Sequence, residues 1–131
     1  MKAFIVRRYI GYLILGSLCF SCQPANEKYN IAVKNLIDLG AVTVGNNINF
    51  AIDLLNPTDQ DLTIMAVKGS CECIIINTYP SVLKPRQNGT INATYTSKFE
   101  RKLAGVLYKD VVIQLNKKPF LHAVKLRVDV K

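Results

Sequence analysis

Most of the chain after residue 31 consists of short runs in which apolar and polar side chains alternate with a period of two. In the clearest run, Ile48, Phe50, Ile52 and Leu54 alternate with polar or small residues. Such alternation places the apolar set on one face of a half-buried β-strand. No segment shows convincing amphipathic-helix spacing, so the chain is predicted to be all-β.

Turn residues divide this pattern into about seven strands with short connections. The expected strands cover residues 32–39 (an edge strand), 47–54, 62–67, 73–76, 91–96, 105–115 and 120–130, with a brief strand at 82–83 inside a loop. Their number and spacing predict an immunoglobulin-like, two-sheet antiparallel sandwich. The chain lacks Trp and a distant cysteine pair, which are the signature of antibody domains.

The N-terminus has the layout of an export signal. Three basic residues within the first eight precede an apolar run at 10–20, and Ser21-Cys22 leads into a polar stretch. The pattern resembles a bacterial lipoprotein signal, in which Cys22 is acylated and becomes the new N-terminus. The apolar run falls short of the roughly 18 residues of a spanning helix. An uncleaved anchor and a core helix remain the alternatives.

The domain organisation follows from this interpretation. We expect a signal peptide at 1–21, a lipidated tether at 22–30 and a sandwich domain at 31–131. The protein is then a lipoprotein of a Gram-negative cell envelope, bound to the membrane by its lipid. Glu27 is the only acid in the tether, which favours the periplasmic side over the cell surface.

The chain is basic, with a formal net charge of +8 that falls to +5 when Lys2, Arg7 and Arg8 leave with the signal. The remaining basic residues are scattered and form no stripe. They are not interleaved with aromatic residues, so nucleic-acid binding is disfavoured. A solvated basic surface near anionic envelope lipids is the favoured interpretation.

Cys71 and Cys73 are the cysteines that remain in the folded domain. An extended pair at this spacing separates its Cα atoms by roughly 6.6 Å, at the long end of disulfide geometry. A bond therefore requires strain or a local bulge. Three interpretations stay open: two small structural side chains, a thiol redox pair, and a soft-metal site for copper or zinc. His122, the only histidine, is a candidate third ligand or a core-edge residue.

The order of several motifs resembles a family of exported bacterial proteins of unknown function, common as lipoproteins in the Bacteroidetes. The resembling segments are Ile37-Asp38-Leu39-Gly40, Ser70-Cys71-Glu72-Cys73, and Leu83-Lys84-Pro85 followed by Gly89, Ile91 and Tyr95. The family has a start like Asp-Phe-Gly, a Ser-Cys-Gly-Cys-Thr motif and an Ile-x-Pro-Gly turn. Here Glu72 replaces Gly, Ile74 replaces Thr, and Arg86-Gln87 stands where Pro-Gly is usual.

The resemblance covers roughly residues 35–95 and implies an immunoglobulin-like fold and an exported location, with no reaction. We therefore predict a non-enzymatic binding or scaffold module that uses no cofactor. Its exposed sheet edges can accept a strand from a protein partner in the envelope. The alternative is a thiol redox or soft-metal handling protein that uses Cys71 and Cys73.

Overall fold

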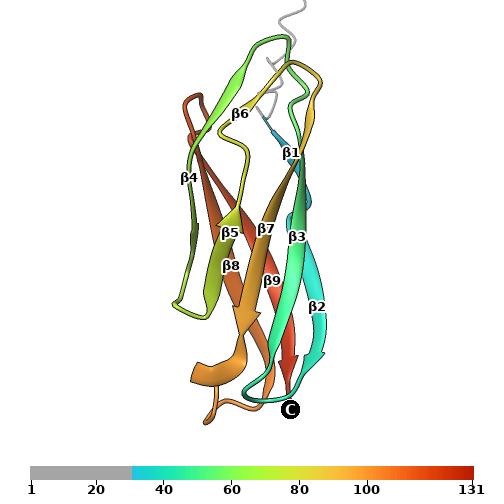
Figure 1. The fold of residues 1–131 in the computed structure, drawn as a ribbon, viewed down its shortest axis with the longest axis vertical. Coiled ribbons are helices and arrows are strands. Elements are labelled where there is room, and N and C mark those ends of the chain that lie inside the picture. The colour runs from blue at the N-terminus through green and yellow to red at the C-terminus, as the bar shows by residue number, and fades with distance from the viewer. Residues whose placement is uncertain (1–30) are drawn as a thin grey trace, which may run out of the picture.

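The computed structural model describes residues 31–131, which form two β-sheets packed face to face (Figure 1). One sheet has the order β1 (Ala32–Val33), β3 (Asn47–Leu55), β7 (Asn88–Thr96), β5 (Ile74–Thr78). The other has the order β2 (Leu36–Val42), β9 (Leu121–Val130), β8 (Gly105–Leu115), β4 (Leu62–Gly69), β6 (Val82–Leu83). The predicted all-β sandwich is confirmed. The predicted signal peptide, Cys22 and the tether lie outside the described residues.

The strands pair antiparallel except β2, which runs parallel to β9 from Leu36 beside Lys125 to Val42 beside Val130. The sequence predicted one edge strand over residues 32–39, and the structure divides it between the two sheets. β1 pairs with β3, and the chain then crosses at residues 34–35 to join β9. Alternation cannot reveal such a crossing, because the apolar side chains point into the same core from either sheet. Within residues 31–131, no helix combines the length and hydropathy needed to cross a membrane.

The core is built from the inward faces of both sheets. Its fully buried side chains include Ile52, Ile91, Tyr95, Val111, Ile113, Val124, Leu126 and Val128. Phe50 has the predicted inward direction but is only partly buried against this core. β1 covers the outer edge of β3 only at Leu54 and Leu55, which leaves Phe50 near an open edge.

β7 begins at Asn88, inside a segment that the sequence predicted to be loop. Gly89 makes this early start feasible, because a Cβ atom at that position would lie 2.6 Å from Leu83 Cδ2. Glycine therefore lets β7 pass closely under the short strand β6. The segment between β6 and β7 lies next to the turn after β3, because the Asn56 amide donates to the Gln87 carbonyl at 3.0 Å.

Candidate functional site

Cys71 and Cys73 lie in the turn between β4 and β5, where they form a disulfide with Cα atoms 5.1 Å apart. The separation is shorter than that of an extended pair because the backbone folds back here. The Ile74 amide donates a hydrogen bond to the Cys71 carbonyl at 3.2 Å. Cys73 is buried and Cys71 is partly exposed. In this oxidised state neither sulfur is a thiolate, the form that attacks disulfides and binds metals.

The disulfide turn is held closely against its neighbours. A Cβ atom added at Gly69 would lie 2.5 Å from Ile74 Cβ, so the strands flanking the turn approach each other too closely for any other residue. The Thr96 amide donates to the Cys73 carbonyl at 2.8 Å, which joins the turn to the end of β7. The turn is thus fixed on both sides by backbone contacts.

A buried ion pair lies beside this turn, although the sequence showed only a charged connection there. Glu100 is 3% exposed, and its Oε1 lies 2.8 Å from Lys109 Nζ. The Tyr95 hydroxyl donates to the same carboxylate oxygen at 3.4 Å. Burial, followed by the charge and the hydrogen bond of Glu100, raises the pKa of Tyr95 to about 12. Glu100 and Lys109 line a hollow of about 340 Å³ together with the disulfide.

His122 lies in a different hollow, of about 900 Å³, between β1 and the start of β9. Burial lowers the pKa of its imidazole. The apolar walls come mainly from Ile31, Val33, Pro57, Pro119, Leu121 and Ala123. The structure therefore brings the two cysteines together and places His122 on another surface. Within the described part of the chain, no group of three or more His, Cys, Asp or Glu side chains is placed to hold a metal ion.

The start of β9 presents an open edge to this groove. β2 pairs with β9 only from Lys125 onward, and the Lys125 amide donates to the Asn35 carbonyl at 2.8 Å. Alternate residues of a strand direct their backbone groups to the same side, so Leu121 and Ala123 direct theirs to the side where β2 is absent. Among residues 31–131, β8 pairs with β9 at these two positions from one side, and no strand pairs with them from the other side.

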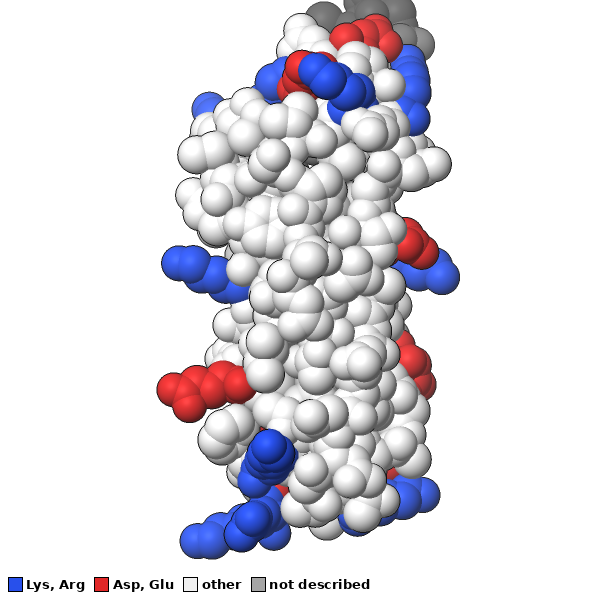
Figure 2. Space-filling model, viewed as in Figure 1, with Lys and Arg blue, Asp and Glu red and all other residues white. Residues whose placement is uncertain are grey.

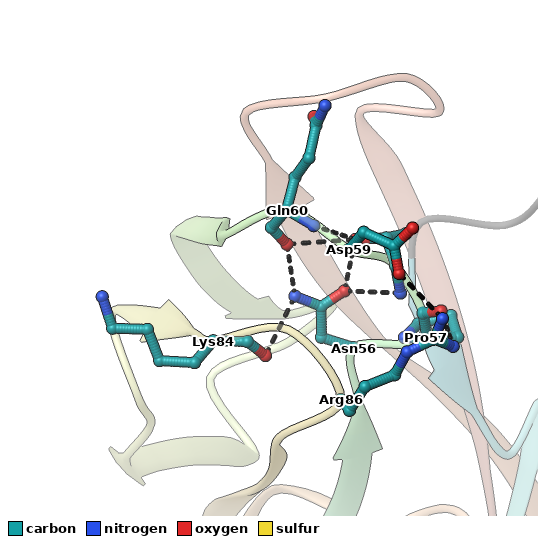
Figure 3. Close-up of polar contacts among 7 residues, drawn as sticks. Asn56, Pro57, Asp59, Gln60, Lys84 and Arg86 are labelled. Carbon is teal, nitrogen blue, oxygen red and sulfur yellow. Dashed lines mark hydrogen bonds and ion pairs between the residues drawn. The ribbon is translucent and has the colours of Figure 1, made fainter.

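Asn56 organises the loops that form the upper wall of the groove (Figure 3). Its side chain is fully buried, and its Nδ2 donates to the carbonyls of Gln60, Leu83 and Lys84 at 2.7, 3.0 and 3.1 Å. Its Oδ1 accepts from the amide and the hydroxyl of Thr58 at 3.0 and 2.7 Å. The sequence indicated only a turn at this position.

Arg86 also connects the segment between β6 and β7 to the turn after β3, through contacts at the protein surface. Its guanidinium donates to the Pro57 carbonyl at 2.6 Å and to Asp59 Oδ1 at 2.8 Å (Figure 3). Its φ of 62° lies in the left-handed region that favours glycine. Arg86 stands where the family motif usually has Pro. The ion pair between Arg86 and Asp59 therefore exists only because of this departure from the motif. Pro57, Thr58 and Arg86 all line the groove.

A comparison with curated proteins finds no match. Among solved structures, a Porphyromonas gingivalis W83 protein of unknown function is similar with a TM-score of 0.67 and 15% identity, over 76% of this chain and 46% of its own. The secreted serine protease VesC from Vibrio cholerae matches with a TM-score of 0.61 and 14% identity, over 77% of this chain and 23% of its own. The YadV chaperone matches with a TM-score of 0.53 and 13% identity, over 79% of this chain and 53% of its own.

These likenesses show the fold, and the chain spans less than two thirds of each of these proteins. The family comparison reaches further, because one family model matches residues 31–130, nearly the whole described sandwich. The resemblance that the sequence showed over residues 35–95 thus extends through β8 and β9. The chain belongs to the family described as Protein of unknown function (DUF1573).

Proposed function

We propose that this protein is a non-enzymatic binding module of the cell envelope that binds an extended polypeptide at the open edge of β9. One observation carries the proposal: on the side of β9 away from β8, the backbone groups of Leu121 and Ala123 face a largely apolar groove, and no described strand pairs with them there. An unpaired strand edge offers hydrogen bonds that an extended backbone satisfies, and neighbouring pockets select its side chains.

The groove defines the side chains that such a polypeptide needs. A strand added at this edge lies beside His122 and Val124, which point toward the interior of the sandwich. Every second side chain of the added strand then enters the space bounded by Ile31 and by Val33 of β1, which belongs to the opposite sheet. The ligand is therefore an extended segment with apolar residues at alternate positions.

The proposed location follows from the N-terminal segment. An acyl chain on Cys22 anchors the protein to a membrane of a Gram-negative cell, and residues 22–30 form the tether, on the periplasmic side. Stable attachment needs more than one acyl chain, so the proposal requires Cys22 to carry at least two. The module then binds its partner close to the membrane that carries it.

The experiment uses the full chain in detergent micelles and a soluble seven-residue peptide of alternating valine and threonine. Amide hydrogen exchange is measured by NMR before and after the peptide is added. Without peptide, the amides of Leu121 and Ala123 exchange fast, while those of His122 and Val124, which face β8, are protected. With peptide, Leu121 and Ala123 become protected as well.

Ala123→Pro is the matched variant, because proline removes an amide that no described strand uses. We expect it to abolish the peptide-dependent protection of Leu121 while the protection of His122 persists. Binding that leaves Leu121 and Ala123 unprotected would show that the peptide uses another edge. Failure of the wild-type protein to protect these amides at any peptide concentration would overturn the proposal.

A further inference from the structure

The segment from Ser97 to Ala104 forms a protruding loop at the end of the sandwich opposite to the groove. It contains the short 3₁₀ helix η1 (Ser97–Phe99) and leads into β8, at the lower left of Figure 1. Phe99 is 62% exposed and Leu103 is 51% exposed. Three cationic side chains are exposed beside them: Lys98, Arg101 and Lys102.

The acid of the loop does not share this surface. Glu100 points inward to Lys109 and Tyr95, so its charge is matched inside the protein. The ion pairs of residues 31–131 include none formed by the three loop cations. Figure 2 shows Lys and Arg side chains gathered at this lower end, while the face above it is mostly uncharged. The outer surface of the loop is thus cationic and apolar.

Backbone contacts hold the loop in this form. The amide of Glu100 donates to Ser97 O at 3.0 Å, and the amide of Leu103 donates to Glu100 O at 2.9 Å. The buried Ser97 hydroxyl lies 2.9 Å from each of the carbonyls of Thr43 and Asn46, which fixes the start of the loop to the turn before β3. These contacts hold Phe99 and Leu103 in exposed positions on the surface of the loop.

We infer that this loop docks on an anionic lipid surface, a function beyond the polypeptide binding proposed above. Phe99 and Leu103 enter the boundary between headgroups and acyl chains, and the three cations bind lipid phosphate groups. Two apolar side chains on a protruding turn suit a bilayer, which they can enter directly. Charge complementarity makes the bilayer an anionic one.

The chain contains no Trp, so Phe99→Trp introduces a single fluorescent probe into the loop. The full-length variant is reconstituted into vesicles of phosphatidylcholine alone or of phosphatidylcholine mixed with phosphatidylglycerol. We expect a blue shift of the Trp emission, and quenching by brominated lipid, only in the vesicles that contain phosphatidylglycerol. High salt should reverse both effects, because it screens the attraction of the cations.

Tyr79→Trp is the matched control, since Tyr79 is partly exposed beyond the far end of β5, away from the loop. Its emission should be the same in both vesicle types. Replacing Lys98, Arg101 and Lys102 together by Ala in the Phe99→Trp protein should remove the dependence on phosphatidylglycerol. The melting temperature of this variant reports whether it is folded.

Three outcomes would overturn the inference. The first is equal Phe99→Trp emission in both vesicle types. The second is a shift of the same size in the Tyr79→Trp control, which would reflect only proximity to the anchor. The third is a shift produced equally by soluble polyglutamate, which would identify an acidic polypeptide as the ligand. None of these results depends on the groove, so they leave the proposed function unaffected.

Discussion

Glu100 lies inside the fold with its Oε1 2.8 Å from Lys109 Nζ, although it belongs to the most highly charged loop of the domain. The side chain of Glu100 is 4% exposed and that of Lys109 is 20% exposed, so water screens this pair poorly. The contact connects the loop to β8 and removes the negative charge of the loop from its outer surface. Tyr95, the largest fully buried side chain of the core, completes the cluster.

The cluster predicts a loss of stability at alkaline pH. Tyr95 has an ordinary pKa of 10.0 when unfolded and a pKa of about 12 when folded, so the folded protein holds this proton more tightly. Stability that is fully present below pH 10 is therefore lost as the pH rises to about 12, by about 2–3 kcal/mol. Urea unfolding of wild type and Tyr95→Phe across this range measures the effect. An equal decline in Tyr95→Phe would assign it to other groups.

Removal of the Asn56 side chain should destabilise the protein strongly. Asn56→Ala leaves three backbone carbonyls and the Thr58 amide without their partner, which should cost about 2–4 kcal/mol. Chemical denaturation measures this difference. Asn77→Ala serves as a control because Asn77 is exposed and, within residues 31–131, its side chain donates to Thr94 alone, so it should change stability by less than about 0.5 kcal/mol. Similar losses in both variants would contradict a special role of the buried amide.

Proline substitutions should distinguish the two sides of β9. Val124 pairs with Val111 of β8, so Val124→Pro removes a hydrogen bond inside the sheet and should cost more than about 2 kcal/mol. Ala123→Pro affects the open side and should cost less than about 1 kcal/mol. Thermal unfolding of both variants tests this order. The reverse order would mean that the backbone of Ala123, rather than that of Val124, is bonded within the sheet.

A structural role of the disulfide predicts a small change when both cysteines are replaced. Cys71→Ala with Cys73→Ala removes a crosslink that closes a very short loop, which should cost about 1–2 kcal/mol. Binding of the valine–threonine peptide should be retained, because the disulfide and the groove are separate. A double variant that keeps near-native stability but cannot replace the wild-type protein in cells would instead favour the redox or metal interpretation.

Membrane attachment is predicted to depend on Cys22, which lies outside the described residues. Cys22→Ser should release the protein from the membrane fraction, because attachment rests on acyl chains rather than on a spanning helix. Cell fractionation followed by immunoblotting measures this. A Cys22→Ser protein that stays in the membrane with its signal uncleaved would contradict the lipoprotein interpretation. Removal of the domain by protease treatment of intact cells would contradict the periplasmic location.

The sequence was sufficient to locate the strands that have one face in the core. Alternation located β3, β8 and β9 to within a residue or two, because burial of every second side chain requires apolar residues at alternate positions of the sequence. The cysteine turn was predicted only in part. The pair was expected at the start of a strand, and the structure places it in the turn just before β5, where its Cα atoms come closer.

The remaining features depend on contacts between distant parts of the chain. Asn56 bonds to carbonyls 27 and 28 residues further along, and its neighbours look like those of any turn asparagine. Glu100 is surrounded in sequence by exposed cations, so only the position of Lys109 shows that it turns inward. The edge of β9 is open because the chain passes from β1 to β2 only at residues 34–35, so β2 reaches β9 only from Lys125 onward. Neither the composition nor the alternation of the sequence indicates where this crossing lies.

β9 runs along the sandwich without a break, from Leu121 at the groove to Val130 beside Gly105, where the cationic loop ends. At 3.3 Å per residue, this strand separates the two surfaces by about 30 Å. One small ligand cannot reach both ends, and neither end blocks access to the other. If the groove and the loop act as proposed, the same strand holds a bound polypeptide at a fixed height above the lipid surface, and the domain then serves as a spacer of defined length.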